Sequence, residues 1–373
     1  MSYMPAESTP HAARRMPPEW APHERCWMAF PPSNETFGAD GGDDLHRARV
    51  AWSAVATTIA KYEPVTLIAG SGQTSIARDY TGDHANITFV ERPLDDSWMR
   101  DIGPTFTVEA DGSLAAVDWV FNGWGAQEWA TWEKDAAIAT AVAELATANG
   151  EAVPVRHSVL TNEGGGIHVD GEGTVLLTDT VQLDPGRNRD WTRAAVEDEI
   201  HAQLGTQKAI WLPRGLTRDY ERFGTRGHVD IVATFTSPGV VAVHAQRSPA
   251  HPDYEVSRAI LALLGAATDV HGNPLHVEEI PAPIVLEHDG LPTDFSYINH
   301  YVGNGFLVVG TFDDPADEVA VDLLAALYPG RTIETVDGTA IFANGGGVHC
   351  ITQQQPAVTP SWAATSADAT GCR

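Results

Sequence analysis

Cysteine and basic residues are scarce in this sequence of 373 residues. The three cysteines, Cys26, Cys350 and Cys372, are too few and too scattered for a disulfide framework or a zinc site, so we expect a reducing, cytoplasmic setting. Lysine and arginine number 23 against 50 acidic residues, which leaves a net charge of −27. This charge argues against a nucleic-acid partner, because phosphate binding requires a basic surface. It would attract a cationic small molecule if it converged on a cleft, although an acidic proteome or a salt-adapted host explains the total charge more simply.

Long apolar runs and cofactor motifs are also absent from the sequence. No stretch reaches the roughly eighteen apolar residues of a membrane-spanning helix, and residues 1–18 lack the apolar core of a secretory signal. No glycine-rich phosphate loop, dinucleotide fingerprint or metal-ligand spacing occurs, so we expect no membrane partner, cofactor or metal. Hydrophobic residues at 43% and charged residues at 20% are ordinary for a globular protein with a sizeable core.

Short apolar runs and helical patterns follow one another in the same order along the chain. A hairpin, a helix and a further strand recur in roughly five units of about seventy residues, so internal repetition is expected. No linker is recognisable, so we expect one α/β domain over residues 1–356 and a disordered, low-complexity tail over 357–373. The expected strands are 26–30, 65–69, 87–90, 104–108, 115–121, 153–155, 166–170, 174–178, 209–212, 228–235, 240–243, 275–280, 297–302, 306–311 and 332–333, and the expected helices are 45–62, 132–149, 191–204, 254–264 and 316–327.

Two glycine-led segments of the chain are nearly identical in pattern. Residues 163–170 read Glu-Gly-Gly-Gly-Ile-His-Val-Asp, and residues 344–351 read Asn-Gly-Gly-Gly-Val-His-Cys-Ile. Residues 227–230 (Gly-His-Val-Asp) provide a third strand start of this kind. Repeated glycine-led strand starts indicate strand ends that converge around a common axis.

Cys350 follows the second of these glycine runs. The glycines let the backbone approach a ligand closely and adopt positive φ angles. We expect Cys350 at the tip of a short apolar strand, where it is well placed to face a ligand. Free cysteine is nevertheless among the most buried residue types, so a core cysteine is an equally good interpretation of the position alone.

Residues 95–104 pack three carboxylates, a tryptophan and an arginine into one loop. Asp101 directly precedes the Gly-Pro that starts a strand, so its side chain can point at a cleft. An ordinary acidic loop with Arg100 paired to a neighbour is the alternative. That alternative would leave the ring of Trp98 in water, whereas the ring suits stacking on a planar cation.

His228 and Asp230 alternate along an expected strand and should share one of its faces. A histidine can act as acid and base near neutral pH, and the carboxylate can orient it or bind a cation beside it. Taken alone, the motif is better explained as a satisfied surface pair. His168 and Asp170 have the same spacing but run into a hairpin turn, so we interpret them as a structural copy.

Cys350, His228, Asp101 and Asp230 form a coherent chemical set. A thiolate needs a cationic neighbour to be populated at neutral pH. Carboxylates beside a thiol do not suit acyl transfer, where an oxyanion must be stabilised. They suit a planar cationic substrate, because a guanidinium group matches paired carboxylates bidentately. The set therefore predicts a guanidino substrate and argues against a cysteine protease.

Motifs along nearly the whole chain resemble those of the agmatine deiminase family, which is related to bacterial-type peptidylarginine deiminases within the guanidino-group-modifying (pentein) superfamily. The resemblance implies a five-bladed, pseudo-symmetric α/β propeller of ββαβ-type repeats. The motifs that carry it are residues 16–20, 27–31, 98–104, 122–125, 163–165, 227–230, 296–299 and 346–356.

The same resemblance implies roles for individual residues. Cys350 would be the nucleophile, His228 the general acid and base, and Asp101 and Asp230 would hold the guanidinium nitrogens. Four further residues, Trp98, Trp124, Glu163 and Asp96, would form or support the substrate pocket.

The implied reaction is hydrolysis of agmatine to N-carbamoylputrescine and ammonia through a covalent thiouronium intermediate, a step of putrescine biosynthesis and polyamine metabolism. The implied partner is a cationic small molecule, and a homo-oligomer is compatible with the sequence.

The segment before His228 departs from the family pattern. Many members of the family have acidic residues directly before the Gly-His-Val-Asp element and an asparagine after it. Residues 220–227 of this chain read Tyr-Glu-Arg-Phe-Gly-Thr-Arg-Gly, and Ile231 follows Asp230. Arg226 could repel the distal amine of agmatine, bind a carboxylate, or pair with Glu221. The alternatives are therefore a deiminase of another guanidino compound, an amidinotransferase in which an amine replaces water, or a guanidino-binding module without catalysis.

Overall fold

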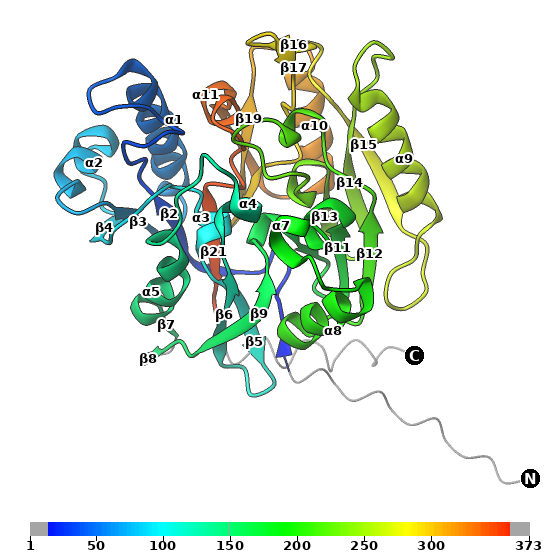
Figure 1. Ribbon diagram of the computed structural model, residues 1–373, viewed down its shortest axis with the longest axis horizontal. Helices are drawn as coiled ribbons and strands as arrows, with labels where there is room; N and C mark the ends of the chain where they lie inside the picture. Colours follow the sequence, from blue (N-terminus) through cyan, green and yellow to red (C-terminus); the bar gives the residue numbers. More distant parts are fainter. Residues whose placement is uncertain (1–13, 149, 359–373) are drawn as a thin grey trace, which may run out of the picture.

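The computed structural model describes residues 14–148 and 150–358 (Figure 1). The tail predicted for 357–373, with Cys372, lies outside the described residues from position 359 onward, as do residues 1–13. Among the residues described, no helix is both long and apolar enough to cross a membrane.

One sheet joins the two ends of the described chain. Strand β2 pairs antiparallel with β21, so that Cys26 lies opposite Gln354, and it pairs parallel with β3, which pairs parallel with β4. The segments that form this sheet and its helices are β2 (His23–Ala29), α1 (Asp43–Ile59), β3 (Val65–Ala69), α2 (Thr74–Thr81), β4 (Ile87–Glu91) and β21 (Thr352–Pro356).

Four more sheets repeat this topology, each with an antiparallel hairpin and a helical crossover to a parallel strand. In chain order, the first of these sheets and its helix consist of β5 (Thr105–Glu109), β6 (Leu114–Val120), α5 (Ile138–Leu145) and β9 (Val155–Thr161), and the second consist of β10 (His168–Val169), β11 (Thr174–Thr178), α8 (Arg193–Leu204) and β12 (Lys208–Leu212). The third consist of β13 (Ala233–Ser237), β14 (Val240–Ala245), α9 (Asp253–Ala266) and β15 (His276–Pro281). The fourth consist of β18 (Tyr301–Gly303), β19 (Phe306–Thr311), α10 (Asp317–Leu327) and β20 (Thr332–Asp337).

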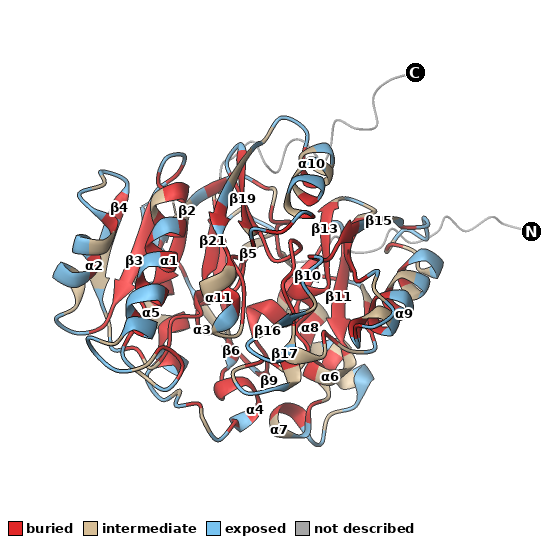
Figure 2. Ribbon diagram, turned by 90° about the horizontal axis from the view of Figure 1, so that it is seen from above, coloured by how far each residue is buried: buried red, intermediate tan, exposed pale blue. Residues whose placement is uncertain are grey.

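The crossover helices cover the strands and face solvent on their outer sides (Figure 2). A strand that pairs with neighbours on both edges and is covered by helices is buried on both faces, so its residues are mostly apolar. All five residues of β3 are buried. Trp52 and Val55 of α1 belong to the core cluster that contains this strand. The apolar runs of the sequence thus become the inner strands, and the α/β prediction is confirmed.

The order of hairpin, helix and strand is confirmed, but several predicted boundaries are wrong. The helix predicted for 132–149 is reduced to a 3₁₀ turn, η1 (Asp135–Ala137), and the eight residues of α5. The strand predicted for 153–155 begins only at Val155 and continues to Thr161.

The largest error concerns the glycine-led strand starts, which are turns. Gly164–Gly166 (η2) and Val229–Ile231 (η4) are 3₁₀ turns, so His228 and Asp230 do not share a strand face. Cys350 lies in a turn two residues before β21 begins at Thr352, so it is not at a strand tip. Residues in these turns do not pair with a neighbouring strand, so their side chains can point toward one another.

Candidate active site

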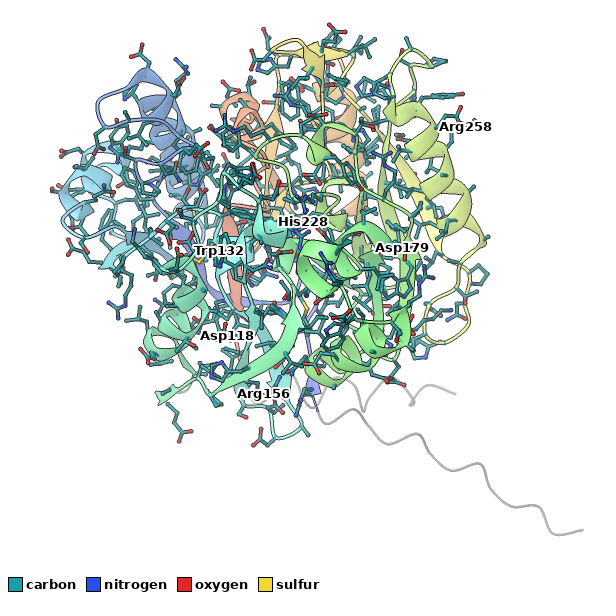
Figure 3. The ribbon with its side chains drawn as sticks, viewed as in Figure 1. Asp118, Trp132, Arg156, Asp179, His228 and Arg258 are labelled. Atoms are coloured by element: carbon teal, nitrogen blue, oxygen red, sulfur yellow. The ribbon has the colours of Figure 1, made fainter. Side chains whose placement is uncertain are left out.

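The turns that precede the strands meet near the middle of the molecule, where Figure 3 shows His228, whereas Arg258 and Arg156 lie at the periphery. The backbone of α3 (Met99–Ile102) holds the cysteine turn, because Arg100 N–H donates to the Cys350 carbonyl at 3.0 Å. A Cβ added to Gly164 would collide with the Arg100 carbonyl. Glycine is therefore required where these turns approach one another.

Gly165 faces three of the predicted site residues. A Cβ at this position would collide with His228 Nδ1 and would lie 3.0 Å from both Asp101 Oδ1 and Asp230 Oδ2. Gly346 faces two further predicted site residues, Trp98 and Cys350, in the same way. A Cβ there would lie 2.7 Å from the Trp98 ring and 3.1 Å from Cys350 Sγ.

The Cys350 thiol is buried among polar groups. Asn299 Nδ2 lies 3.2 Å from Sγ, and Asp230 Oδ2 lies 3.6 Å from it. Burial, followed by the charges of Asp230 and Asp101, raises the pKa of Cys350 well above its usual value. The group is therefore a protonated thiol at neutral pH until a cation arrives to offset the two carboxylates.

His228 is buried between two carboxylates. Its Nε2 lies 3.2 Å from Glu163 Oε2, and its Nδ1 lies 3.9 Å from Asp101 Oδ1. Burial lowers the pKa of His228, but the Asp101 charge and the hydrogen bond to Glu163 outweigh it and raise the pKa to about 9. The imidazole is thus protonated at neutral pH, and Nδ1 has no hydrogen-bond partner within the described part of the chain.

Asp101 is held by two donors. Trp124 Nε1–H donates to Oδ2 at 2.9 Å and Gly165 N–H donates to Oδ1 at 3.0 Å. Burial raises the pKa of Asp101 to about 6, and the charges of Glu163 and Asp230 act in the same direction. The carboxyl group is therefore mostly ionised at neutral pH.

The indole of Trp124 comes from a strained turn, α4 (Gly123–Ala126), in which all four residues have positive φ. Trp124 and Ala126, at φ 55 and 54, are the two non-glycine residues of the four. Such conformations cost about 1–3 kcal/mol each and persist where the surroundings hold them, often at functional sites. Here the strained turn delivers the hydrogen bond to Asp101.

Asp230 leaves one carboxylate oxygen unused. Its Oδ2 accepts from His349 Nδ1–H at 2.7 Å, while Oδ1 is buried and has no partner among residues 14–148 and 150–358. Although burial alone would raise its pKa, the hydrogen bond and charge of His349 lower the pKa of Asp230. An unpartnered buried atom is costly, so Asp230 Oδ1 and His228 Nδ1 mark the place of a polar ligand.

Glu163 contacts His228 at Nε2 and is itself held by Arg187. Arg187 Nε donates to Glu163 Oε1 at 2.9 Å, and Arg187 Nη1 donates to Asp184 Oδ2 at 2.8 Å. Arg226 joins the same network through its Nη1, which lies 3.2 Å from Asp184 Oδ2. The suggested pairing of Arg226 with Glu221 is therefore replaced by pairing with Asp184.

The two remaining predicted residues have different surroundings. Trp98 is buried beside Gly346 and packs edge-on against Trp52, with ring centroids 5.2 Å apart. Asp96 is not brought together with the others. It accepts from Thr36 Oγ1 at 2.8 Å and from Ser97 N–H at 2.8 Å, and it lines a separate hollow with Lys134.

Several residues in contact with the site were not singled out from the sequence. His349 and Asn299 touch Asp230 and Cys350, and Arg187 fixes Glu163. The available signals were the position of His349 directly before Cys350 and the presence of Asn299 in the motif at 296–299.

Glu19, His168 and His349 are the described residues whose atom types and spacing could hold a metal ion. Their ligand atoms are already engaged, because His349 Nε2 lies 2.6 Å from Glu19 Oε1 and His168 Nε2 lies 2.7 Å from Thr234 Oγ1. Arg100 Nη1 lies 3.5 Å from Glu19 Oε1 and would repel a cation. The group therefore fits an ion-pair cluster better than a metal site.

Comparisons with known proteins agree over almost the whole chain. Residues 15–356 match the family of Porphyromonas-type peptidyl-arginine deiminases. A Streptomyces coelicolor protein provisionally named an agmatine deiminase is 59% identical over 343 residues, which is 92% of this chain and 98% of that protein. The agmatine deiminase of Pseudomonas aeruginosa is 37% identical over 372 residues, covering 94% of this chain and 98% of the relative. The solved structure of the Enterococcus faecalis agmatine deiminase has a TM-score of 0.85 at 30% identity, covering 95% of this chain and 99% of that one. The chain therefore belongs to the agmatine deiminase family, within the Porphyromonas-type peptidyl-arginine deiminases.

Proposed function

We propose that the protein hydrolyses the guanidinium group of agmatine to give N-carbamoylputrescine and ammonia. The observation that carries this proposal is the convergence of a protonated imidazole and two carboxylates on Gly165 and of a buried thiol on Gly346, with Asp230 Oδ1 left as an unpartnered buried acceptor. Such a site suits a planar cation with several N–H donors. The names of the relatives support agmatine as that cation.

In the first step, Asp101 and Asp230 bind the guanidinium nitrogens. Asp230 Oδ1 is the free acceptor, while the Trp124 and Gly165 donors keep Asp101 ionised and oriented. The substrate charge offsets the two carboxylates, lowers the pKa of Cys350 and allows the thiol to lose its proton to solvent water. Binding and activation of the nucleophile are thereby coupled.

In the second step, a bond forms between Cys350 Sγ and the guanidinium carbon, and the C=N electron pair moves to nitrogen. His228 gives its Nδ1 proton to the departing nitrogen, the C–N bond breaks with its electron pair on that nitrogen, and ammonia leaves. A cationic thiouronium remains on Cys350. General acid assistance of this kind contributes typically about 10²–10⁴-fold.

In the third step, the neutral His228 takes a proton from water, whose oxygen bonds to the same carbon. The C–S bond then breaks with its electron pair on sulfur, and the hydroxyl proton of the product passes to Cys350, which restores the thiol as the ureido product leaves. Glu163 keeps the imidazole oriented throughout, because it lies 3.2 Å from Nε2.

The test is ammonia and ureido-product release from agmatine, arginine and shorter or longer guanidinoalkylamines, with no amine acceptor added. Agmatine should be turned over best, and Cys350→Ser should release no ammonia. Cys26→Ala is the matched control, since Cys26 is the other described free cysteine and lies in a sheet core. Faster release from arginine would overturn the substrate assignment, and product formation only with an added amine would indicate amidino transfer.

The larger architecture and setting remain part of this proposal. Five sheets of one topology support a five-bladed, pseudo-symmetric propeller formed by one catalytic domain over residues 1–356. A reducing, cytoplasmic setting is supported by the two unpaired cysteines of the described chain. The net charge of −27 supports a cationic partner over nucleic acid, and a homo-oligomer is compatible with these features.

A further inference from the structure

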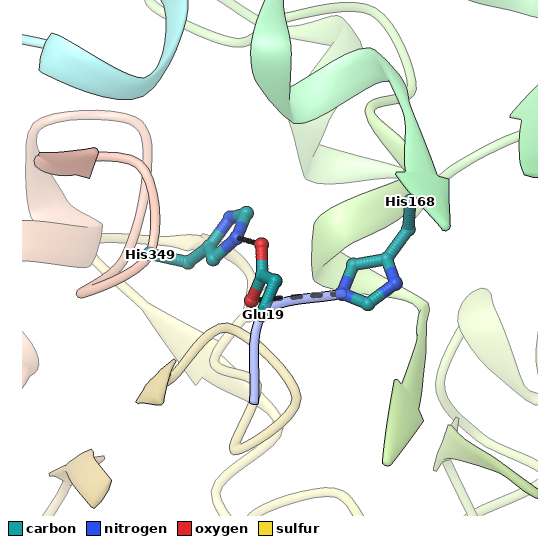
Figure 4. A group of neighbouring side chains, drawn as sticks. All are labelled: Glu19, His168 and His349. Carbon is teal, nitrogen blue, oxygen red and sulfur yellow. Dashed lines mark hydrogen bonds and ion pairs between the residues drawn. The ribbon is translucent and has the colours of Figure 1, made fainter. Parts of the chain in front are cut away.

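Glu19 and His349 form a buried ion pair (Figure 4), and His349 also contacts Asp230; these three side chains are called the relay. Glu19 comes from the segment before β2 and reaches His349, with Oε1 2.6 Å from Nε2. The other ring nitrogen of His349, Nδ1, lies 2.7 Å from Asp230 Oδ2. Each of the three side chains is at least nine-tenths buried. The relay therefore connects a residue far from the thiol to a predicted substrate-binding carboxylate.

The two short contacts determine the protonation of His349. Each ring nitrogen faces a carboxylate oxygen, and a carboxylate can only accept hydrogen bonds. A neutral imidazole has a single N–H, so one of the two contacts would bring lone pairs together. Both contacts are satisfied when His349 is an imidazolium that donates from Nδ1 and Nε2.

The groups around His349 leave Glu19 and Asp230 as its counter-ions. Arg100 opposes the charge from α3, with Nη1 3.5 Å from Glu19 Oε1. His168 faces it from β10, with ring centroids 6.2 Å apart. His300 is close enough to feel the charges of Glu19 and His349, and burial lowers its pKa to about 4, so it is neutral.

We propose that Glu19 is a positioning residue, which holds His349 as a doubly protonated imidazolium and thereby turns Asp230 so that Oδ1 stays free for the substrate. This inference rests on the proposed function for its catalytic consequence. With Oδ2 engaged by His349, the free oxygen is the only acceptor that Asp230 can offer to a guanidinium nitrogen. The imidazolium also places a positive charge on the residue next to Cys350, which favours the thiolate.

The titration behaviour of the three groups agrees with this geometry. Burial and Arg100 lower the pKa of His349, but Glu19 and Asp230 outweigh them and raise it. Burial alone would raise the pKa of Glu19, yet the charges of His349 and Arg100 hold it well below its usual value. Removing the Glu19 charge should therefore release the His349 proton at lower pH.

The first test compares the pH profiles of Glu19→Gln and Glu63→Gln. Glu63 is a matched control because it is also a buried carboxylate, 3.3 Å from the ring of His23, within the apolar sheet core. In the wild-type protein His228, with its pKa raised to about 9, sets the alkaline limb of kcat/KM. In Glu19→Gln, the pKa of His349 should fall by about one to three units, the usual effect of one close opposite charge, so that His349 loses its proton first and the alkaline limb moves below 9. Glu19→Asp should restore the limb, and Glu63→Gln should leave it in place. An unshifted limb in folded Glu19→Gln would overturn the proposal.

The second test needs no variant of Glu19 and does not depend on activity. Nitrogen-15 NMR of the histidine side chains at pH 8, with His349 assigned by its loss in His349→Asn, should show both ring nitrogens protonated. A single N–H on His349 would overturn the proposal even if Glu19→Gln fails to fold. If the wild-type protein releases no ammonia from agmatine, the proposed function fails while this measurement still decides the relay.

Discussion

The two glycine-led segments at 163–170 and 344–351 have the same sequence pattern, but different side chains surround their glycines. In the first, Gly165 lets Asp101, Asp230 and His228 lie close to the backbone and to one another. In the second, Gly346 lets Trp98 and Cys350 lie close to the backbone, and Cys350 occupies the position that Val169 of β10 has in the first. The histidines of the two turns face each other across Glu19, yet only His349 also touches Asp230. The repeat thus provides the geometry, and a few single residues provide the chemistry.

The largest expected effect comes from the residue that distinguishes the turns. Cys350→Val should abolish ammonia release, with a loss of at least about four powers of ten in kcat, because no covalent intermediate can form. The double variant Cys350→Val/Val169→Cys should remain inactive, because Val169 is buried in an apolar cluster away from the carboxylates. Substantial activity in the double variant would show that the two turns are chemically equivalent.

The next effect concerns the space that the first turn provides. Gly165→Ala should lower kcat/KM by about a hundredfold or more, since its Cβ would displace His228 or the aspartates by about an ångström. Gly265→Ala is the matched control, because Gly265 lies in α9 with no atom within 4 Å of the added Cβ. Steady-state kinetics on both variants measures the difference, and an unimpaired Gly165→Ala would exclude this place as the substrate site.

The raised pKa values of Asp101 and His228 predict how kcat/KM depends on pH. Asp101 must be ionised and has a raised pKa of about 6, so binding is lost as the pH falls through 6. His228 must be protonated to act as the acid and has a raised pKa of about 9, so activity is lost as the pH rises through 9. The profile of kcat/KM should therefore be a bell between these limits. A flat response from pH 7 to 11 would contradict the assignment of His228.

The smallest effect separates the two histidines. His349→Asn removes a donor to both Asp230 and Glu19, so KM for the guanidino substrate should rise at least about tenfold. His168→Asn removes contacts with Thr234 and Glu19 on the far side of the relay and should change KM less than about threefold. Equal KM values for the two variants would show that the contact with Asp230 does not matter.

Much of the fold followed from the sequence. Apolar runs such as 65–69 become strands because burial on both faces requires mostly apolar residues. The glycine-led segments were wrongly predicted to start strands. Two polar residues separated by one position, such as His228 and Asp230, occur in a strand and equally in a 3₁₀ turn that is held by contacts with distant residues. Val229–Ile231 is such a turn, and the side chains of His228 and Asp230 meet around Gly165 instead of along a strand.

The site residues could be predicted where several reactive side chains occur within one short motif. Contacts between residues that lie far apart in the sequence could not be predicted. Cys350, His228, Asp101 and Asp230 are brought together around Gly165 and Gly346. Asp96 is not, because Thr36 and Ser97 take its carboxylate in another direction. Glu19 contacts His349 across 330 positions, a distance over which the sequence contains no pairing signal.

The central claim is that Cys350 attacks the guanidinium carbon. Quenching the protein with acid during turnover of agmatine and measuring the mass of the peptide that contains residue 350 tests it directly. A mass increase equal to agmatine minus ammonia is expected on Cys350, and none on Cys26 or in Cys350→Ser. Continued ammonia release with no adduct on Cys350, or an adduct on another residue, would contradict it.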